Sequence, residues 1–190
     1  MQQDSFYNEE FSKEFHDNDL AGCELEACVF KRCIFTNVNF SKTVFLDCEF
    51  VECEFVNASI CMCAWRSVTF CDCKLQGMRF DLSNTFLLEL HFDKCLLRYS
   101  SYYGLDLTKS SFNACDMRET EFIEANLSGL SLDDCDLQSA AFGQTNLSKT
   151  DFSNARGYQL NPDNNQVDQA LFSREGLTGL VEHLNIIIKP

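Results

Sequence analysis

Basic residues, prolines and long apolar runs are scarce in this chain. Fifteen Lys and Arg stand against 29 Asp and Glu, which gives a formal net charge of −14. Nucleic-acid phosphates demand a basic surface, so this charge argues against direct binding to nucleic acid and favours a basic protein partner. The only prolines are Pro162 and Pro190, and no apolar stretch approaches the ~20 residues that cross a bilayer. No basic start precedes an apolar run, so we expect no secretory signal, no membrane association and a cytoplasmic location.

Phenylalanine and cysteine, by contrast, are abundant, with 18 and 12 residues. Every fifth residue from Leu20 to Phe80 is Phe, Leu, Ile or Trp. The register then jumps by two, and a similar rule holds from Leu87 to Phe152, with Tyr and Met as variants. Side chains repeat at 3.6 residues in a helix and at 2.0 in a flat strand, so neither element explains a period of five.

A second inward position lies two residues before each large apolar residue and is mostly small. One large and one small inward residue in every five indicate a chain that turns a corner in each repeat. Four such sides close a coil of 20 residues, and coils stack at the strand spacing of ~4.8 Å. The predicted core columns are Phe30, Phe50, Phe70, Phe92, Phe112 and Phe152, and Cys33, Cys53, Cys73, Cys95, Cys115 and Cys135. The register jump predicts a two-residue bulge near Asp81–Asn84.

This pattern resembles the pentapeptide-repeat family, A(D/N)LxX, over roughly residues 20–156. The resemblance implies an all-β fold, a right-handed quadrilateral parallel β-helix. We interpret residues 1–19 as an irregular N-terminal cap and 157–190 as a C-terminal cap or dimerisation segment. Ser173 is a good N-cap for a helix over about 174–184. Ile186, Ile187 and Ile188 favour a short strand after it.

An apolar stripe runs along this C-terminal segment. Its spacing indicates one face of a helix that either plugs the last coil or joins two subunits, and the residues alone favour neither. In gyrase-protecting members of the family this module forms a two-fold dimer, so the resemblance favours a homodimer. The candidate interface residues are Leu177, Leu180, Val181, Leu184, Ile186 and Ile188.

No catalytic or metal site is predicted. Cys61, Cys63, Cys71 and Cys73 have ligand-like spacing, but the repeat turns Cys63 and Cys73 inward and the other two outward, so the sulfurs do not converge. The histidines, His16, His91 and His183, have no nucleophile partner, and no glycine-rich phosphate loop occurs. Outer sides of such a coil are convex, whereas catalysis needs a concave pocket. We therefore expect neither enzyme activity nor a cofactor.

One outer side is predicted to be more acidic than the others. Its candidate partner-facing residues are Glu49, Glu52, Asp72, Asp93, Asp133, Asp134 and Asp151, against Lys31, Arg32 and Lys94. Such charge either keeps a rod soluble or binds a basic partner, and charge alone does not separate these two interpretations.

Within the family the chain is most similar to the gyrase-protecting Qnr, MfpA, AlbG and McbG group, in length, acidity, Cys- and Phe-rich coils (FLDCEFVECEF) and the ending GLTGLVEHLNIII. The resemblance implies a DNA mimic that binds DNA gyrase or topoisomerase IV. It further implies resistance or immunity to quinolone-, albicidin- or microcin-like agents. Many Qnr proteins carry long loops that are absent here. The alternative is a non-enzymatic scaffold for another protein partner.

Overall fold

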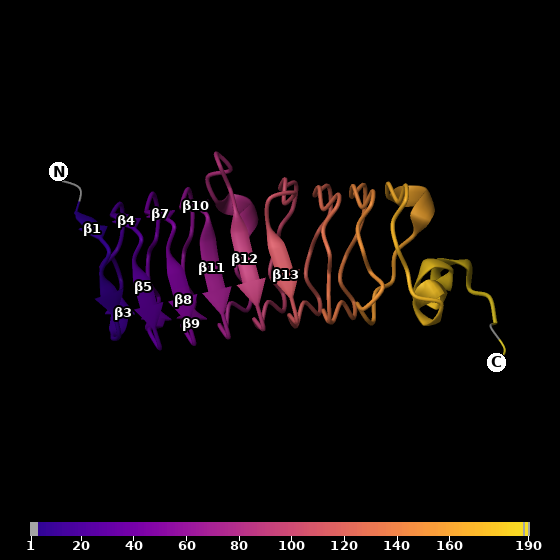
Figure 1. Cartoon of the computed structure of the whole chain (residues 1–190), viewed down its shortest axis with the longest axis horizontal. Coiled ribbons are helices and arrows are strands. Elements are labelled where there is room, and N and C mark those ends of the chain that lie inside the picture. Colours follow the sequence, from indigo (N-terminus) through magenta and orange to yellow (C-terminus); the bar gives the residue numbers. More distant parts are fainter. Residues whose placement is uncertain (1–3, 188, 190) are drawn as a thin grey trace.

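Short parallel strands stack into three sheets along a rod in the computed structural model, which describes residues 4–187 and 189 (Figure 1). The first sheet contains β1 (Ser5–Tyr7), β4 (Glu24–Glu26), β7 (Val44–Leu46) and β10 (Ala64–Arg66). The second contains β2 (Glu10–Phe11), β5 (Val29–Lys31), β8 (Glu49–Val51), β11 (Val68–Cys71), β12 (Leu90–Asp93) and β13 (Ser111–Asn113). The third contains β3 (Glu14–His16), β6 (Ile34–Thr36) and β9 (Glu54–Val56). The predicted parallel β-solenoid is confirmed.

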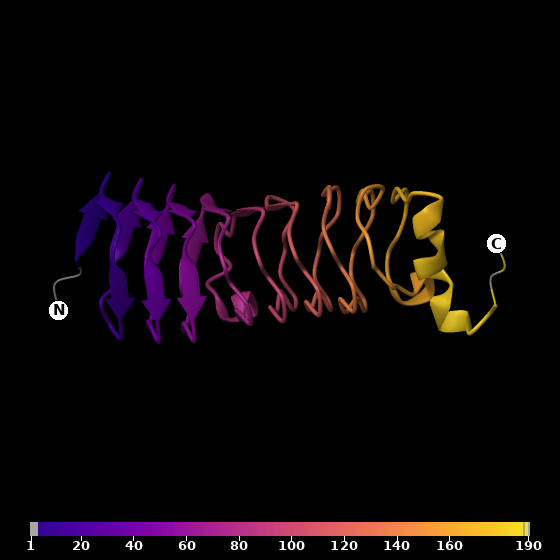
Figure 2. The ribbon, with the colours of Figure 1, turned by 90° about the horizontal axis from the view of Figure 1, so that it is seen from below.

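The residue just before a large inward residue differs between many of the strands and many of the turns. In β5 and β8 it is Val29 and Glu49, and a three-residue strand forms. Where it is Asp or Asn, the side chain accepts a hydrogen bond from the backbone N–H two residues on, as Asp106 does from Thr108 (3.0 Å) and Asn146 from Ser148 (3.1 Å). Such Asx turns compete with the ladder, so much of the C-terminal half shows isolated bridges and few strands (Figure 2).

Most corners of the coil fall two residues after a large inward residue, where the backbone has a left-handed φ. Arg32 (φ 53°) and Lys149 (φ 61°) adopt this conformation despite their side chains, and Gly129 (φ 77°) adopts it without strain. The repeated corner is what closes four sides into a coil.

The core is a set of aromatic and cysteine columns. Phe50 stacks on Phe30 with ring centroids 4.6 Å apart and planes 7° apart, and Phe70 stacks on Phe50 at 4.9 Å. All six predicted phenylalanines and all six predicted cysteines are at most 2% exposed. The thiols of Cys53, Cys73 and Cys95 each donate to the carbonyl oxygen of a phenylalanine in the preceding coil, at 3.3 Å. The columns therefore bury thiols with their hydrogen bonds satisfied.

The N-terminal segment is a further coil, which corrects the predicted boundary at Leu20 and the irregular cap over 1–19. β1, β2 and β3 pair in parallel with β4, β5 and β6. Phe11 stacks on Phe30 at 4.9 Å and Phe15 on Phe35 at 5.1 Å. The spacing of four between Phe11 and Phe15 breaks the period of five, which hides this coil from a strict repeat search.

The two extra residues lie later than predicted. The register of 20 still holds at Ala64↔Asn84 and has become 22 at Val68↔Leu90, so the bulge falls between these bridges and not at Asp81–Asn84. Leu88, 6% exposed, enters the core, whereas Leu87 is 54% exposed at φ 59°. The second series of the repeat therefore does not begin at Leu87 as the spacing predicts, because the turn absorbs one residue more.

The coils also continue beyond the predicted end at residue 156. Asp151 bridges to Leu171, and Phe172 stacks on Phe152 at 5.2 Å. η1 (Phe80–Leu82) and η2 (Pro162–Asn164) are single 3-10 turns within the coils. η3 (Glu175–Leu180) and η4 (Glu182–Leu184) occupy the predicted helix position, and η3 lies across the end of the rod (Figure 2).

The predicted C-terminal helix is thus 3-10 rather than α-helical, and it breaks at Val181 (φ −117°, ψ 0°). Two glycines among the six residues of η3 disfavour an α-helix. The N-cap residue of η3 is Arg174 and not Ser173 as predicted, although Ser173 Oγ still accepts from the backbone N–H of Gly176 at 3.1 Å. Ile186 and Ile187 form no strand, and Ile188 lies outside the described residues.

Candidate partner-binding surface

One side of the rod gathers all seven predicted carboxylates, and we call these seven residues the acidic side. They lie on the sheet that contains β8, β11 and β12, at its corner, or on the coils that extend this sheet. The residues are Glu49, Glu52, Asp72, Asp93, Asp133, Asp134 and Asp151. The repeat therefore brings together side chains that lie up to about 100 residues apart in the sequence.

Ion pairs neutralise part of the acidic side. Arg32 Nε lies 2.9 Å from Glu52, Lys94 Nζ lies 3.5 Å from Asp93, and Arg156 lies 3.5 Å from Asp134. The remaining four carboxylates, those of Glu49, Asp72, Asp133 and Asp151, form no ion pair within the described part of the chain. The acidic side thus presents free negative charge at several levels of the rod.

Hydrogen bonds fix two of these free carboxylates. Asp133 accepts from Asn154 Nδ2 at 2.7 Å, one coil on. Asp151 accepts from the backbone N–H of Ser153 at 2.8 Å, and hydrogen bonding from Ser153 lowers the pKa of this carboxyl. Both groups are therefore held in place as preorganised anions, which suits them to a cationic partner.

The neighbouring side carries a charge ladder that is close to neutral. Arg118 Nε donates to Asp116 at 2.7 Å and lies 4.0 Å from Asp136, and Arg156 Nε lies 3.4 Å from Asp136. The Arg118 hydrogen bond lowers the pKa of Asp116. Since these acids are matched by arginines, this neighbouring side carries less net negative charge than the acidic side.

An apolar projection stands at the bulge. A repeat that restarts with Leu87 turned inward would point Phe86 and Leu88 outward, but the exposed pair is Phe86 (64%) and Leu87 (54%). Arg66 lies over the Phe86 ring, 5.6 Å from its centroid, and Asn84 accepts from the Phe86 backbone N–H. The two consecutive leucines that follow Thr85–Phe86 give no signal of which one turns inward.

The C-terminal end is partly packed on the last coil and partly exposed. Leu180 packs against the core, as a plug does, and Val181 is half-buried. Leu177, Leu184 and Ile186 are 48%, 54% and 56% exposed. Of the predicted interface residues, these three therefore offer apolar surface, and Ile188 lies outside the described residues.

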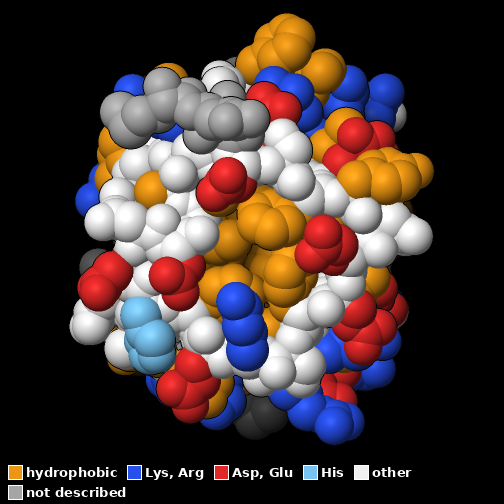
Figure 3. Space-filling model, turned by 90° about the vertical axis from the view of Figure 1, so that its left-hand side faces the viewer, with side chains coloured by type: hydrophobic (Ala, Val, Ile, Leu, Met, Phe, Trp, Pro, Cys, Tyr) orange, Lys and Arg blue, Asp and Glu red, His pale blue; other side chains and the backbone are white. Residues whose placement is uncertain are grey.

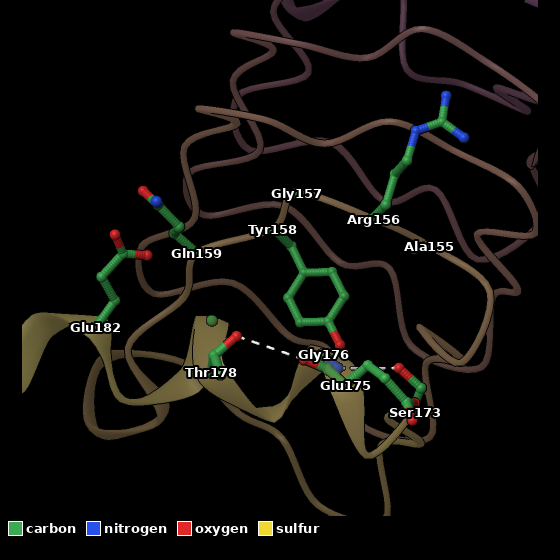
Figure 4. Close-up of a pocket in the computed structure, with 11 residues that line it drawn as sticks. Ala155, Arg156, Gly157, Tyr158, Gln159, Ser173, Glu175, Gly176, Thr178 and Glu182 are labelled. Atoms are coloured by element: carbon green, nitrogen blue, oxygen red, sulfur yellow. Dashed lines mark hydrogen bonds between the residues drawn. The ribbon is translucent and has the colours of Figure 1, made fainter. Parts of the chain in front are cut away.

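A cleft of about 320 Å³ separates the last coil from η3 (Figure 4). The Tyr158 ring points from the coil toward Gly176, between Arg156 on one side and Glu182 on the other. Two glycines permit this approach, because a Cβ on Gly176 would lie 1.9 Å from Tyr158 Oη and one on Gly179 would lie 2.1 Å from the Tyr158 carbonyl oxygen. The GLTGL segment thus fixes η3 to the coil.

Cys61, Cys63, Cys71 and Cys73 face the way the repeat predicts. Cys63 and Cys73 are buried, Cys61 is exposed and Cys71 is half-buried. Burial raises the pKa of Cys48 to about 12, so that thiol stays neutral at pH 7. His91 lies between Ser111 Oγ (2.9 Å) and Glu89 (3.1 Å). No three acidic, histidine or cysteine side chains among residues 4–187 and 189 converge as metal ligands.

Family comparisons agree with this repeat. A model of pentapeptide repeats in nine copies matches residues 14–54, and a model of the pentapeptide repeat region matches residues 105–180. The two together span more than half of the chain. The protein belongs to the pentapeptide-repeat family. No curated protein matches its sequence.

Solved pentapeptide-repeat structures share the fold at low sequence identity. Two trypsin-treated variants of QnrB1, a plasmid-mediated fluoroquinolone resistance protein, align with TM-scores of 0.66 and 0.55 at 17% and 16% identity. They cover 100% and 97% of this chain and all of their own. HetL, from the cyanobacterium Nostoc, aligns at 0.52 and 16% identity over 88% of this chain and 87% of its own. None of the described helices is long and apolar enough to span a membrane.

Proposed function

We propose that this pentapeptide-repeat protein mimics duplex DNA and binds the basic DNA-binding surface of DNA gyrase or topoisomerase IV. Its role would be resistance or immunity to gyrase-targeting antibiotics or toxins of the quinolone, albicidin or microcin kind. The action is binding, not catalysis, and such a target places it in the cytoplasm. The single observation that carries the proposal is the acidic side, where free carboxylates recur along a straight rod.

The spacing of charge supports a partial mimic. Coils repeat every ~4.8 Å, and duplex DNA carries one charge per ~1.7 Å of axis. One acidic side therefore offers fewer charges per length than DNA, but it holds them on a rigid frame. Rigid, preplaced charges lose little entropy on binding. The fold shared with QnrB1, a fluoroquinolone resistance protein by description, agrees with this target.

The proposal includes a homodimer formed through the C-terminal end. Leu177, Leu184 and Ile186 expose apolar surface there, while Leu180 closes the coil beneath. A two-fold pairing would roughly double the length of acidic rod. Sedimentation velocity tests it: Leu184→Glu with Ile186→Glu should give a monomer, whereas Leu171→Glu, equally exposed at 54% but on a coil side, should leave the dimer intact. A monomeric parent protein would contradict it.

A supercoiling assay with purified gyrase tests the target. The protein should change supercoiling, or its inhibition by a titrated drug, and Asp133→Lys with Asp134→Lys should weaken this effect at least tenfold. The matched control is Glu121→Lys with Glu124→Lys, which makes the same charge change on the opposite side of the coil. No effect of the parent protein, with or without drug, would reject the proposal.

The second candidate is a scaffold for a different protein. HetL, described as involved in heterocyst differentiation regulation, shares the fold about as well as one QnrB1 variant, so the fold alone does not select a topoisomerase. A pull-down from the native host that recovers one saturable partner and no topoisomerase would favour the scaffold.

A further inference from the structure

The two ends of the rod are covered differently. η3 packs across the C-terminal end, and the backbone N–H of Leu160 donates to the Gly179 carbonyl oxygen at 3.1 Å. At the N-terminal end, β1, β2 and β3 are the terminal strands of their sheets, and no described strand pairs with their outer edges. Open strand edges are ready templates for another strand, and solenoid ends generally need a cap.

The centre of the N-terminal end is apolar. Phe6 and Phe11 pack on the core but remain partly exposed. Lys13 lies over the Phe15 ring with Nζ 4.6 Å from its centroid. Figure 3 shows hydrophobic side chains in the middle of this end with acidic side chains around them. The end thus offers an aromatic platform together with free backbone hydrogen-bonding groups.

The rim of this end is strongly acidic. Between residues 4 and 20 one lysine stands against six acidic residues, Asp4, Glu9, Glu10, Glu14, Asp17 and Asp19, all exposed. A second copy placed end to end would set these carboxylates against each other, and like charges directly opposite are destabilising. The charge therefore favours a basic occupant.

The coils themselves show which strand fits such an edge. Phenylalanine stacks on phenylalanine from one coil to the next, as Phe30 does on Phe11. Outward bases pair with acids of the adjacent coil: Lys31 with Glu10 at 2.8 Å, Arg32 with Glu52 at 2.9 Å, and Lys74 with Glu54 at 3.1 Å. By the same rule, a strand added beyond β2 would carry an apolar residue inward over Phe11 and basic residues outward.

We propose that the N-terminal end binds an extended segment of a partner protein in which basic and apolar residues alternate, added as one more strand on the outer edge of β2. Main-chain hydrogen bonds supply affinity in this mode, and alternate side chains supply specificity. The surface is separate from the acidic side and does not depend on topoisomerase binding.

The test uses the full chain and a nine-residue synthetic peptide that alternates lysine with valine or phenylalanine. Backbone amide NMR should show saturable shifts confined to residues 4–20. A peptide N-methylated at alternate positions cannot pair along the edge, and it should bind at least tenfold more weakly. Glu10→Gln with Glu14→Gln should also weaken binding at least tenfold.

The matched control is Glu52→Gln with Glu54→Gln, which also removes two carboxylates and their contacts but lies two coils further on. It should leave peptide affinity within twofold of the parent. Shifts spread along the acidic side, equal binding of the methylated peptide, no saturation at millimolar peptide, or a head-to-head dimer that protects residues 4–20 would each overturn the proposal.

Discussion

The Trp65 ring stacks on the Phe45 ring, 20 residues earlier in the chain, with centroids 4.9 Å apart and planes 9° apart. The indole N–H donates to Ser83 Oγ at 3.1 Å, so the one polar atom of this buried ring is satisfied. The relationship shows how the rod is held together: the core side chains of each coil pack on those of the coil before it. Stability is accordingly close to a sum of neighbouring coil contacts.

Phe70→Ala should be among the most destabilising single changes. Phe70 is fully buried between Phe50 at 4.9 Å and Phe92 at 5.2 Å. Removal of the ring leaves a cavity in a stacked column, so the free energy of unfolding should fall by about 3–5 kcal/mol. Urea unfolding followed by circular dichroism measures it. Phe86→Ala, which truncates an exposed ring, should stay within about 0.5 kcal/mol of the parent, and equal losses for both would contradict the stacked core.

Gly129→Ala should isolate the cost of the left-handed corner. The φ of Gly129 is 77°, and an added Cβ would meet no atom within 4 Å, so backbone strain alone opposes alanine. The free energy of unfolding should drop by about 1 kcal/mol. Lys149→Ala, at an equivalent corner that already holds a side chain, should change little. A neutral Gly129→Ala would show that these corners relax readily.

Gly179→Ala should displace η3 from the last coil. Its Cβ would lie 2.1 Å from the Tyr158 carbonyl oxygen, a backbone atom that cannot move aside alone. We expect a loss of about 1–3 kcal/mol and faster amide hydrogen exchange over residues 158–184. Gly143→Ala, whose Cβ would come no closer than 3.4 Å to a side-chain atom, serves as the control. Unchanged exchange in Gly179→Ala would mean that η3 is not fixed by this contact.

Acid should weaken the charge ladder through Asp116. The Arg118 hydrogen bond lowers the pKa of Asp116 in the folded state, so its contribution to stability is present above the ordinary carboxyl pKa of about 3.9 and is lost as pH falls through the lower, folded value. Urea midpoints from pH 6 to pH 2 should therefore fall less steeply in Asp116→Asn than in the parent. Identical slopes would show that this pair does not contribute to acid unfolding.

The sequence predicted the interior of the rod better than its ends, for a physical reason. From Phe30 to Phe80 a large apolar residue recurs every five residues without interruption, a period that fits neither a helix nor a flat strand. Between Phe11 and Phe15 the repeat is one residue short. At Thr85–Glu89 it is two residues too long, and the spacing does not tell which of Leu87 and Leu88 is buried. After Arg156 the chain makes an irregular turn that breaks the period of five. Leu160 and Phe172 nevertheless pack on the core beyond this turn.

The seven carboxylates of the acidic side could be assigned to one side of the coil from the register alone. Which of them remain free could not, because two of the three ion pairs are formed with arginines one coil away. Arg156, for example, belongs to the neighbouring side yet reaches Asp134. The close contact of Gly176 and Gly179 with Tyr158 was equally beyond the spacing, because it joins segments that belong to different elements.

Competition between this protein and duplex DNA for purified gyrase tests the central claim most directly. With fluorescently labelled protein bound to gyrase, unlabelled linear DNA should displace it completely, and the affinity should fall steeply as salt rises, because both ligands use one basic surface. Failure to bind gyrase, or a stable complex that contains gyrase, DNA and this protein on separate surfaces, would contradict DNA mimicry.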